Sequence, residues 1–449
     1  MSGIALYPSP IPMTSKWKTR LTIESQTEMR KLINKGPVNL EDTQIAYSHL
    51  NSWELRKASL LFQIMGNPLI SQLGQKSLLL ALRLHLPVSG LIKFGFFSHF
   101  CGGTSLEDCE SLVEKLRRKG VDALLDFAGE QSSSEQERDQ SCTEVLRAID
   151  SSQDRGLRFS VFKPTAIIDP KLLEKVSNAL KGQGIQIVSK SHLADLNSGE
   201  RKDWERGTER FRKLCQKAHS AGIQVLVDAE ESWIQYAADA LVWENMLKWN
   251  KERPIVFQTI QMYRTDRLDY LYTLNKEAES LKISVGIKLV RGAYMEKERA
   301  RAKAQSTPDP IHSHKDKTDR DYTSALSFVL ERLENISLFV GTHNQSSIEL
   351  ALNFLAKQKN LSPALIQQNL CFSQLLGMSD PLTFNLAHGG YYVSKYVPYG
   401  PIRAAIPYLI RRAQENSSVT GQVNKDSEAI RKEIQSRKER GLLEVSPVK

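Results

Sequence analysis

From residue 121 onward, the chain alternates short apolar runs, rich in β-branched residues, with longer amphipathic segments. Helix-like stretches such as 207–222, 267–282 and 323–335 separate the apolar runs. Apolar strands that alternate with amphipathic helices are typical of a parallel sheet covered by helices. The eight runs cover residues 121–127, 158–164, 222–230, 254–262, 284–292, 337–344, 370–377 and 391–400.

Eight β/α units favour a closed barrel over an open doubly wound sheet. We therefore predict an α/β fold, a distorted (β/α)8 barrel of the TIM type, over residues 116–420. Residues 1–115 lack β-rich runs and show helical periodicity at 43–66 and 105–118, so they predict an N-terminal helical arm. Residues 421–449 predict a charged C-terminal helical tail with i,i+4 pairs.

Two connections in the predicted barrel are longer than a tidy β/α unit needs. Residues 165–221 predict an extra helical insertion, and residues 128–157 include the low-complexity sequence QSSSEQERDQS. We expect both segments to be surface excursions.

Polar residues stand toward the C-terminal end of all eight predicted strands. The C-terminal ends of barrel strands form the active-site face, so the pattern predicts one polar site at the barrel mouth. The residues are Asp126, Lys163, Asp228, Gln261, Arg291, His343, Gln374 and Tyr396.

The net charge of +10 comes from Lys and Arg residues spread along the chain, and no nucleic-acid motif accompanies them. We expect no nucleic-acid partner; a basic face toward anionic lipid or simple solubility explains the charge. Five cysteines without CxxC spacing predict a reducing compartment and no metal site. The most apolar stretch, 77–100, is interrupted by charged residues and Pro87, so it predicts a buried or membrane-surface helical pair rather than a membrane span.

The sharpest local motif is YLIRRAQE at residues 408–415. On a helix, Tyr408, Arg411, Arg412 and Glu415 fall on one face. Two adjacent guanidiniums beside a tyrosine form a fork for a small carboxylate, and Glu415 can hold one of the arginines. A solvated charged face is the alternative, but the position just after the eighth strand favours the fork.

Two further groups carry chemistry. Lys163 and Asp228 end neighbouring strands, where an ion pair, structural or functional, is natural because each charge is costly to bury alone. KLVRGAY at 288–294 and GTHN at 341–344 place cations, an approachable glycine and a His–Asn pair at strand ends. These groups suit a diphosphate or an electron-rich ring, although neither GxGxxG nor a P-loop is present.

Six ordered motifs between about residue 100 and 420 resemble the proline dehydrogenase family. They are LVDAE (226–230), TIQMY (259–263), KLVRGAY, GTHN, QLLGM (374–378) and YVPYGPIRAAIPYLIRRAQEN (396–416). The segment before the barrel is similar to the helical arm of single-function members, and no aldehyde dehydrogenase half follows, so we expect a stand-alone enzyme.

The resemblance implies a flavin-dependent oxidation of L-proline to 1-pyrroline-5-carboxylate, the first step of proline catabolism, with FAD across the barrel mouth and a quinone as electron acceptor. It implies that Arg411 and Arg412 pair with the substrate carboxylate, and that Glu415 supports them. The other implied substrate-site residues are Lys163 with Asp228, Tyr294, Leu375, Tyr396 and Tyr408. The implied flavin-contact positions are Ala229, Gln261, Lys288, Val290, Arg291, Gly292, Ala293, Thr342, His343, Asn344 and Gln374.

The chain departs from the family pattern at two positions. Many bacterial members carry arginine where this chain has Lys288, near the flavin N5, and lysine keeps the charge without the planar fork. Pro164 stands where leucine is usual, which a strand end tolerates.

Three other functions stay open at this point. Hydroxyproline dehydrogenase is the nearest, although the family members of that kind carry a smaller residue at Tyr396. A barrel lyase that uses Lys163 as a Schiff-base amine is the second, and a non-catalytic basic barrel is the third. Without a clear transit peptide we expect a cytoplasmic protein, optionally peripheral on the inner membrane, or a mitochondrial one in a eukaryote.

Overall fold

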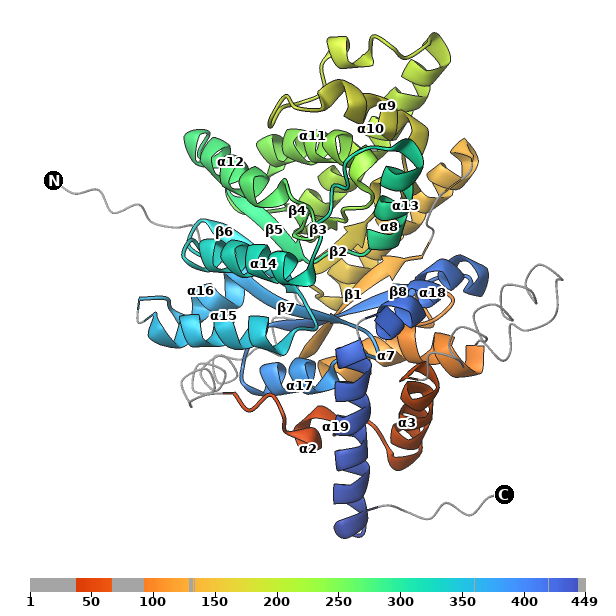
Figure 1. Ribbon diagram of the computed structural model, residues 1–449, viewed down its shortest axis with the longest axis vertical. Coiled ribbons are helices and arrows are strands. Elements are labelled where there is room, and N and C mark those ends of the chain that lie inside the picture. The colour runs from red at the N-terminus through yellow and green to blue at the C-terminus, as the bar shows by residue number, and fades with distance from the viewer. Residues whose placement is uncertain are drawn as a thin grey trace.

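The computed structural model describes residues 38–66, 93–128, 132, 134–358, 360–418 and 420–442, and it contains the predicted eight strands. All strands run parallel in one sheet of order β1-β8-β7-β6-β5-β4-β3-β2, and helices surround it (Figure 1). The fold prediction is therefore confirmed. The strands are β1 (Val121–Phe127), β2 (Phe159–Phe162), β3 (Gln224–Val227), β4 (Val256–Gln261), β5 (Val285–Val290), β6 (Ile336–Gly341), β7 (Leu370–Leu375) and β8 (Val393–Tyr399).

The sheet curls into a nearly closed barrel. β1 pairs with β8 along its whole length, from Val121 opposite Val393 to Phe127 opposite Tyr399. β1 and β2 also lie next to one another, but no backbone ladder joins them within the described ranges. Side chains bridge this seam instead, because Lys163 after β2 donates to Asp126 of β1.

The interior of the barrel follows the two-residue period of the strands. Leu124, Val161, Leu226 and Phe339 meet there as one apolar layer beneath the mouth, together with Phe257. β5 contributes Gly286 at this level, because a Cβ there would overlap the Phe257 ring. The filled interior makes the barrel a packed core, so a ligand can enter only at an end.

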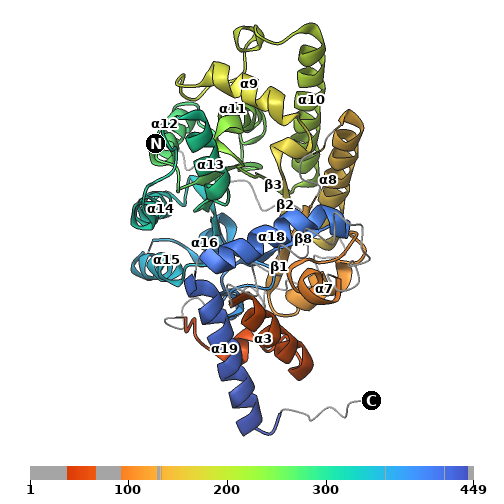
Figure 2. The same cartoon turned by 45° about the vertical axis from the view of Figure 1, so that its right-hand side comes forward.

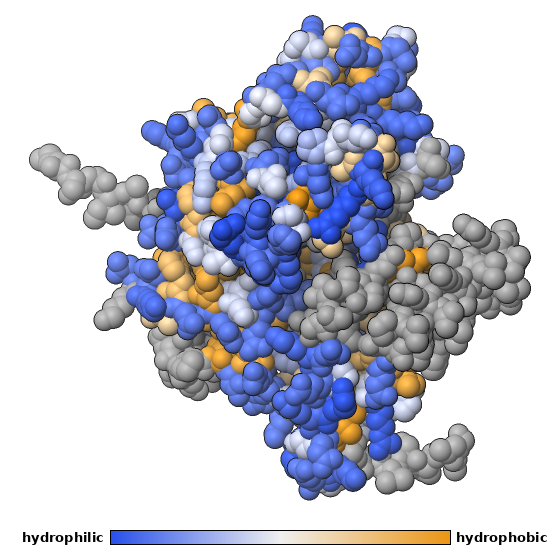
Figure 3. Space-filling view, viewed as in Figure 1, coloured by the Kyte–Doolittle hydropathy of each residue, from blue (hydrophilic) through white to orange (hydrophobic). Residues whose placement is uncertain are grey.

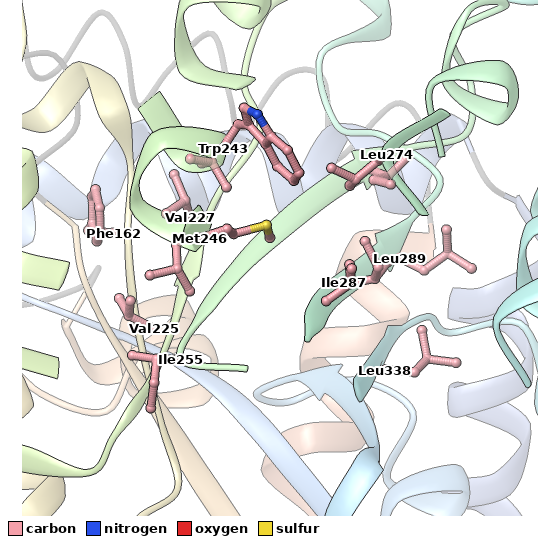
Figure 4. Packing of buried hydrophobic residues seen from close by; sticks show 14 of the residues in the cluster. Phe162, Val225, Val227, Trp243, Met246, Ile255, Leu274, Ile287, Leu289 and Leu338 are labelled. Atoms are coloured by element: carbon pink, nitrogen blue, oxygen red, sulfur yellow. The ribbon is translucent and has the colours of Figure 1, made fainter. Parts of the chain in front are cut away.

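Helices cover the outside of the sheet and bury its second face. In this layer Trp243 and Met246 pack over Val227, and Ile287 and Leu289 continue the layer along β5 (Figure 4). The helices after the first strand are α8 (Glu135–Arg155), α9 (Pro170–Leu180), α10 (Ser198–Ala221), α11 (Ser232–Trp249), α12 (Arg267–Ser280), α13 (Met295–Gln305), α14 (Lys315–Leu330), α15 (Gln345–Lys357), α16 (Pro363–Asn369), α17 (Asp380–His388), α18 (Ile402–Ser418) and α19 (Thr420–Glu439).

The prediction of a surface excursion is wrong for one of the two segments. Residues 165–221 do form an insertion, with α9, the 3-10 turn η3 (Lys190–Leu193) and α10. Residues 128–157, in contrast, supply the regular barrel helix α8, which Ser134 caps by accepting a hydrogen bond from the backbone N–H of Glu137. The polar composition misled because the buried face of α8 includes Arg138, Ser141 and Ser152 rather than a run of large apolar residues.

The N-terminal region is helical where the structure describes it. It contains α2 (Thr43–Ala46), α3 (Ser52–Gly66), the π-helix η1 (Lys93–Phe97), α6 (Ser98–Phe100) and α7 (Glu110–Arg117). The predicted helical pair at 77–100 falls mostly in 67–92, outside the described residues. Within the described part, no helix has the length and apolar character needed to cross a bilayer.

The C-terminal helix α19 packs beside α3 rather than extending into solvent (Figure 2). Arg437 donates to the backbone oxygens of Tyr47 and Leu50, at 2.8 and 2.9 Å, and to Glu433. The arm and the tail therefore form one helical layer on the barrel. In the view of Figure 3, hydrophilic side chains cover most of the described surface.

Candidate active site

A cavity of about 620 Å³ opens at the C-terminal ends of the strands. All eight strand-end polar residues predicted from the sequence line it. Of the twenty predicted site residues, nineteen line the same cavity. The twentieth, Glu415, lies on α18, but its side chain is outside the described residues.

A buried ionic cluster forms the floor of the cavity. The Nζ of Lys163 lies 2.8 Å from Asp126 Oδ2 and 3.9 Å from Asp228 Oδ2. The predicted Lys163–Asp228 pair is therefore present, but Asp126 is the closer partner. Asp228 binds Lys288 at 2.5 Å instead, and it accepts a 3.0 Å hydrogen bond from the hydroxyl of Tyr396. Lysines and carboxylates alternate around one tyrosine.

Burial decides the protonation of the tyrosine in this cluster. Burial, and then the charges of Asp126 and Asp228, raise the pKa of Tyr396 well above its usual value. The Tyr396 hydroxyl therefore keeps its proton and acts as a donor. Burial also raises the pKa of the Asp126 carboxyl, while the neighbouring Lys163 ammonium opposes that shift.

Helix α18 forms one wall of the cavity and follows β8 directly. Its residues Tyr408, Arg411 and Arg412 all line the cavity, as their helical spacing predicts. The guanidinium of Arg411 lies 5.8 Å from the ring centre of Tyr294, and that of Arg412 lies 5.1 Å from the ring centre of Tyr408. Arg412 is only 7% exposed, which rules out the fully solvated charged face.

The end of β5 supplies a second cationic wall. Arg291 binds Asp319 at 2.7 Å, and donates to the hydroxyls of Thr342 and Ser347 at 2.9 and 3.0 Å. The next residue, Gly292, has a φ of 133°, and a Cβ there would overlap the Tyr263 ring. Only glycine fits this position, so backbone forms the cavity wall here.

Strands β6 and β7 end in polar groups that hold one another. Gln374 donates to the backbone oxygen of Thr342 at 3.1 Å and accepts from Thr383 at 2.8 Å. His343 Nδ1 lies 2.9 Å from Ser379 Oγ. Burial, and then the charges of Lys395, Arg412 and Arg291, lower the pKa of His343 to about 3. The imidazole is therefore neutral at physiological pH.

The cavity also contains residues that the sequence did not assign to the site. Asp126 belongs to the predicted set of strand-end polar residues, but the sequence gives it no role of its own. Lys315 and Lys425 come from the starts of α14 and α19, where no strand-end pattern marks them. The other unassigned lining residues are Thr259, Phe339, Gly341, Gln345, Ser346, Ser373 and Met378.

The charge of the cavity selects anions. Seven Lys and Arg side chains line it against two carboxylates, Asp126 and Asp228. This excess favours a ligand set with several negative charges, more than one small carboxylate supplies. No cluster of three or more His, Cys, Asp or Glu suited to a metal ion occurs among the described residues.

Known proteins resemble this chain in sequence and in fold. The chain is 32% identical over 430 residues to proline dehydrogenase 1, mitochondrial, of Dictyostelium discoideum, covering 88% of this chain and 74% of that protein. It is 29% identical over 412 residues to hydroxyproline dehydrogenase of Xenopus laevis, covering 86% and 88%. The crystal structure of proline utilization A from Bdellovibrio bacteriovorus, inactivated by N-propargylglycine, shares the fold with a TM-score of 0.60 at 18% identity. That match covers 88% of this chain and 41% of the other.

A family model adds the extent of the match along the chain. The model described as proline dehydrogenase matches residues 109–425, which include the eight strands, α18 and the start of α19. The matched segment supplies every residue that lines the mouth cavity. This chain belongs to the proline dehydrogenase family of oxidoreductases.

Proposed function

We propose that the protein oxidises L-proline to 1-pyrroline-5-carboxylate with FAD as its cofactor. The observation that carries the proposal is the pair Arg411 and Arg412, which faces the buried Asp126–Lys163–Asp228–Lys288–Tyr396 floor across one cavity. A cationic fork opposite a closed polar floor suits a small amino acid held by its carboxylate.

The residues present fit a flavin dinucleotide. The excess of cations matches a diphosphate, and Gly292 adds a stretch of bare backbone to the cavity lining. Asn344 caps α15, so the start of this helix adds a positive dipole end at the cavity. When bound, the flavin supplies the hydride acceptor. The residues that would hold it are Ala229, Gln261, Lys288, Val290, Arg291, Gly292, Ala293, Thr342, His343, Asn344 and Gln374.

The chain's own residues orient the substrate. Arg411 and Arg412 would bind the carboxylate, and Glu415 would hold one of them in place. Tyr294, Tyr396, Tyr408 and Leu375 would wall the pyrrolidine ring and exclude water. Fixing the carboxylate and the ring would hold the C–H bond beside nitrogen in one orientation. Such positioning of the reacting bond accelerates the reaction.

The floor cluster would close the substrate end of the cavity and hold its charged groups in fixed positions. The ammonium of Lys163 is held by Asp126 and lies 3.2 Å from the Tyr396 hydroxyl. An ammonium paired in this way is a poor nucleophile, so the arrangement counts against a Schiff-base lyase. The amine proton of the substrate would leave to solvent before or during hydride transfer.

Hydroxyproline is the second candidate substrate, because the Xenopus laevis relative is named for it. Tyr396 argues against it, since its hydroxyl is already bound to Asp228 and its ring fills the floor of the cavity. Replacing Tyr396 with a smaller residue should widen the substrate range toward hydroxyproline.

The proposed function also includes an electron acceptor, a cellular location and a division of the chain into domains. Reduced flavin would pass its electrons to a membrane quinone, and the excess of Lys and Arg would favour peripheral contact with anionic lipid. Residues 116–420 would form the catalytic barrel, with 1–115 and 421–449 as helical additions.

The direct test is the absorption spectrum of the purified protein. The proposal expects a flavin band that bleaches when L-proline is added without oxygen, and bleaches far more slowly with trans-4-hydroxy-L-proline. Borohydride trapping that labels Lys163 in a colourless protein would instead support the lyase, and steep salt-dependent DNA binding without flavin would support a non-catalytic barrel.

A further inference from the structure

The start of the C-terminal helix α19 reaches the mouth of the barrel. Lys425, in the second turn of α19, lines the cavity, and its side chain is exposed. In both views α19 begins near the barrel mouth beside α15 and then runs away along α3 (Figures 1 and 2). A helix outside the β/α repeat therefore contributes directly to the site.

The next residue of α19 makes a buried contact with the loop after β7. Asp426 is 3% exposed, and its Oδ2 accepts a 3.1 Å hydrogen bond from the backbone N–H of Ser379. Ser379 has a φ of 53°, which is costly for a residue with a side chain. Its Oγ lies 2.9 Å from Nδ1 of the cavity residue His343. Two hydrogen bonds in series thus connect α19 to the cavity lining.

The far half of α19 is anchored independently. Glu433 accepts a 2.9 Å hydrogen bond from the hydroxyl of Thr43, and Arg437 binds the backbone of the arm. These contacts fix the direction of the helix. Lys425 is therefore held at the cavity by packing at both ends of α19.

The cavity changes in character from its floor to its rim. Asp126, Lys163 and Lys288 at the floor are buried, whereas Lys315 and Lys425 are exposed. Ser346, at the start of α15, is exposed at the same rim. The rim thus combines the ammonium of Lys425 with the start of α15, both of which suit phosphate oxygens, while the ammonium of Lys315 already pairs with Asp319.

We propose that α19 is part of the cofactor site: Lys425 binds the diphosphate of the dinucleotide at the rim, and Asp426 positions Ser379 and His343 against the ligand. This inference rests on the proposed flavin cofactor. It assigns to the C-terminal helix a role in cofactor retention that its charged composition alone does not indicate.

The first test compares cofactor retention in Lys425→Ala and Lys425→Glu with that in Lys432→Ala. Lys432 is an exposed lysine on the same helix, paired with Glu428. Loss of one charge-assisted hydrogen bond should raise the FAD dissociation constant about tenfold in Lys425→Ala, and further in Lys425→Glu. Riboflavin, which has no phosphate, should bind the wild type and all variants equally. Equal FAD affinity in Lys425→Glu and Lys432→Ala would overturn the assignment of Lys425.

The second test separates positioning by Asp426 from simple docking of α19. Asp426→Ala should lose FAD, while Asp426→Asn keeps an acceptor for the Ser379 N–H and should recover most of the affinity. Arg437→Ala should lower Tm but leave the FAD content and the visible flavin spectrum unchanged. If Arg437→Ala loses as much FAD as Asp426→Ala, docking alone explains the effect and the positioning role is wrong. A wild-type protein without flavin would instead overturn the proposed function itself.

Discussion

The two ends of the β1–β8 strand pair carry the same residue types with opposite consequences. At the mouth, Asp126 of β1 and Tyr396 of β8 face the cavity. Four residues earlier in sequence, Asp122 of β1 and Tyr392, the residue just before β8, bind one another at the base, where Tyr392 donates to Asp122 Oδ2. Side chains alternate between the two sides of an extended chain, so residues four apart point to the same side. Asp122 therefore shares a side with Asp126, and Tyr392 with Tyr396.

The cation at each end explains the difference. At the base, Arg158 uses its donors on the protein itself: the side-chain oxygen of Gln224 at 2.6 Å, the backbone oxygen of Gln367 at 2.8 Å, and the backbone oxygen of Gln368. Its guanidinium also lies 5.0 Å from the ring centre of Tyr392. At the mouth, the lysines and the α18 guanidiniums line open space. A buried carboxylate, a tyrosine and a cation therefore make a plug when they close on one another, and a site when they face a cavity.

The first and largest effect should separate a mouth arginine from the base arginine. Arg412→Met should lower kcat/KM for L-proline about a thousandfold if it removes one side of the proposed charge-assisted fork for the substrate carboxylate. Arg158→Met should leave the kinetic constants nearly unchanged but lower the free energy of unfolding by about 1 to 2 kcal/mol, because it removes the donor from the buried Gln224 side chain and from two less buried backbone oxygens. Steady-state kinetics and urea unfolding of both variants measure the contrast. A kinetic defect in Arg158→Met with unchanged stability would reverse the comparison.

The sequence predicted the fold and most of the candidate site because both follow from where the strands lie and where they end. The apolar runs located every strand, and strand direction then placed residues such as Gln261 and Gln374 at one mouth. Helical spacing placed Tyr408, Arg411 and Arg412 on one wall.

The features that the sequence missed depend on contacts between distant elements. The sequence predicts a Lys163–Asp228 pair, but Asp126 is the closer partner of Lys163, because β1 lies beside β2 where the barrel closes and side chains rather than a backbone ladder span the two strands. Lys425 reaches the cavity because α19 packs on the loop after β7 at one end and on the arm, more than 350 residues away in sequence, at the other. The helix α8 was missed because its buried face mixes small apolar residues such as Val145 and Ile149 with polar ones such as Arg138 and Ser141.

A second effect concerns Glu230, which follows β3 at the mouth end of the barrel. Like the residues at the base, it is buried and bonded to the protein itself. Its carboxylate accepts from the backbone N–H and the hydroxyl of Thr165, at 3.0 and 2.6 Å, and burial raises its pKa to about 8. The unfolded chain releases this proton at lower pH, so Glu230 costs stability as the pH rises from about 4.5 to 8. Relative to wild type, Glu230→Gln should gain about 3 kcal/mol of unfolding free energy between pH 5 and pH 8.

Urea unfolding at both pH values measures the Glu230 effect, with Glu209→Gln as the control at an exposed carboxylate of α10. The control should follow the wild type at both pH values. If Glu230→Gln also follows the wild type, the carboxyl is ionised at pH 5 and burial does not hold its proton.

The smallest effect should come from the hydroxyls of Tyr396 in β8 and of Tyr392 just before it. Tyr396→Phe removes the donor to Asp228 at the floor of the cavity, and should lower kcat/KM for L-proline about tenfold by losing a charge-assisted hydrogen bond. Tyr392→Phe removes the donor to Asp122 at the base, and should instead lower the free energy of unfolding by about 1 to 2 kcal/mol with kcat/KM within a factor of two. Because both changes delete one tyrosine hydroxyl, the changes in charge and volume are matched. Equal kinetic losses in the two variants would mean that the two ends are coupled through β8, and that the base of the barrel cannot be treated as a plug alone.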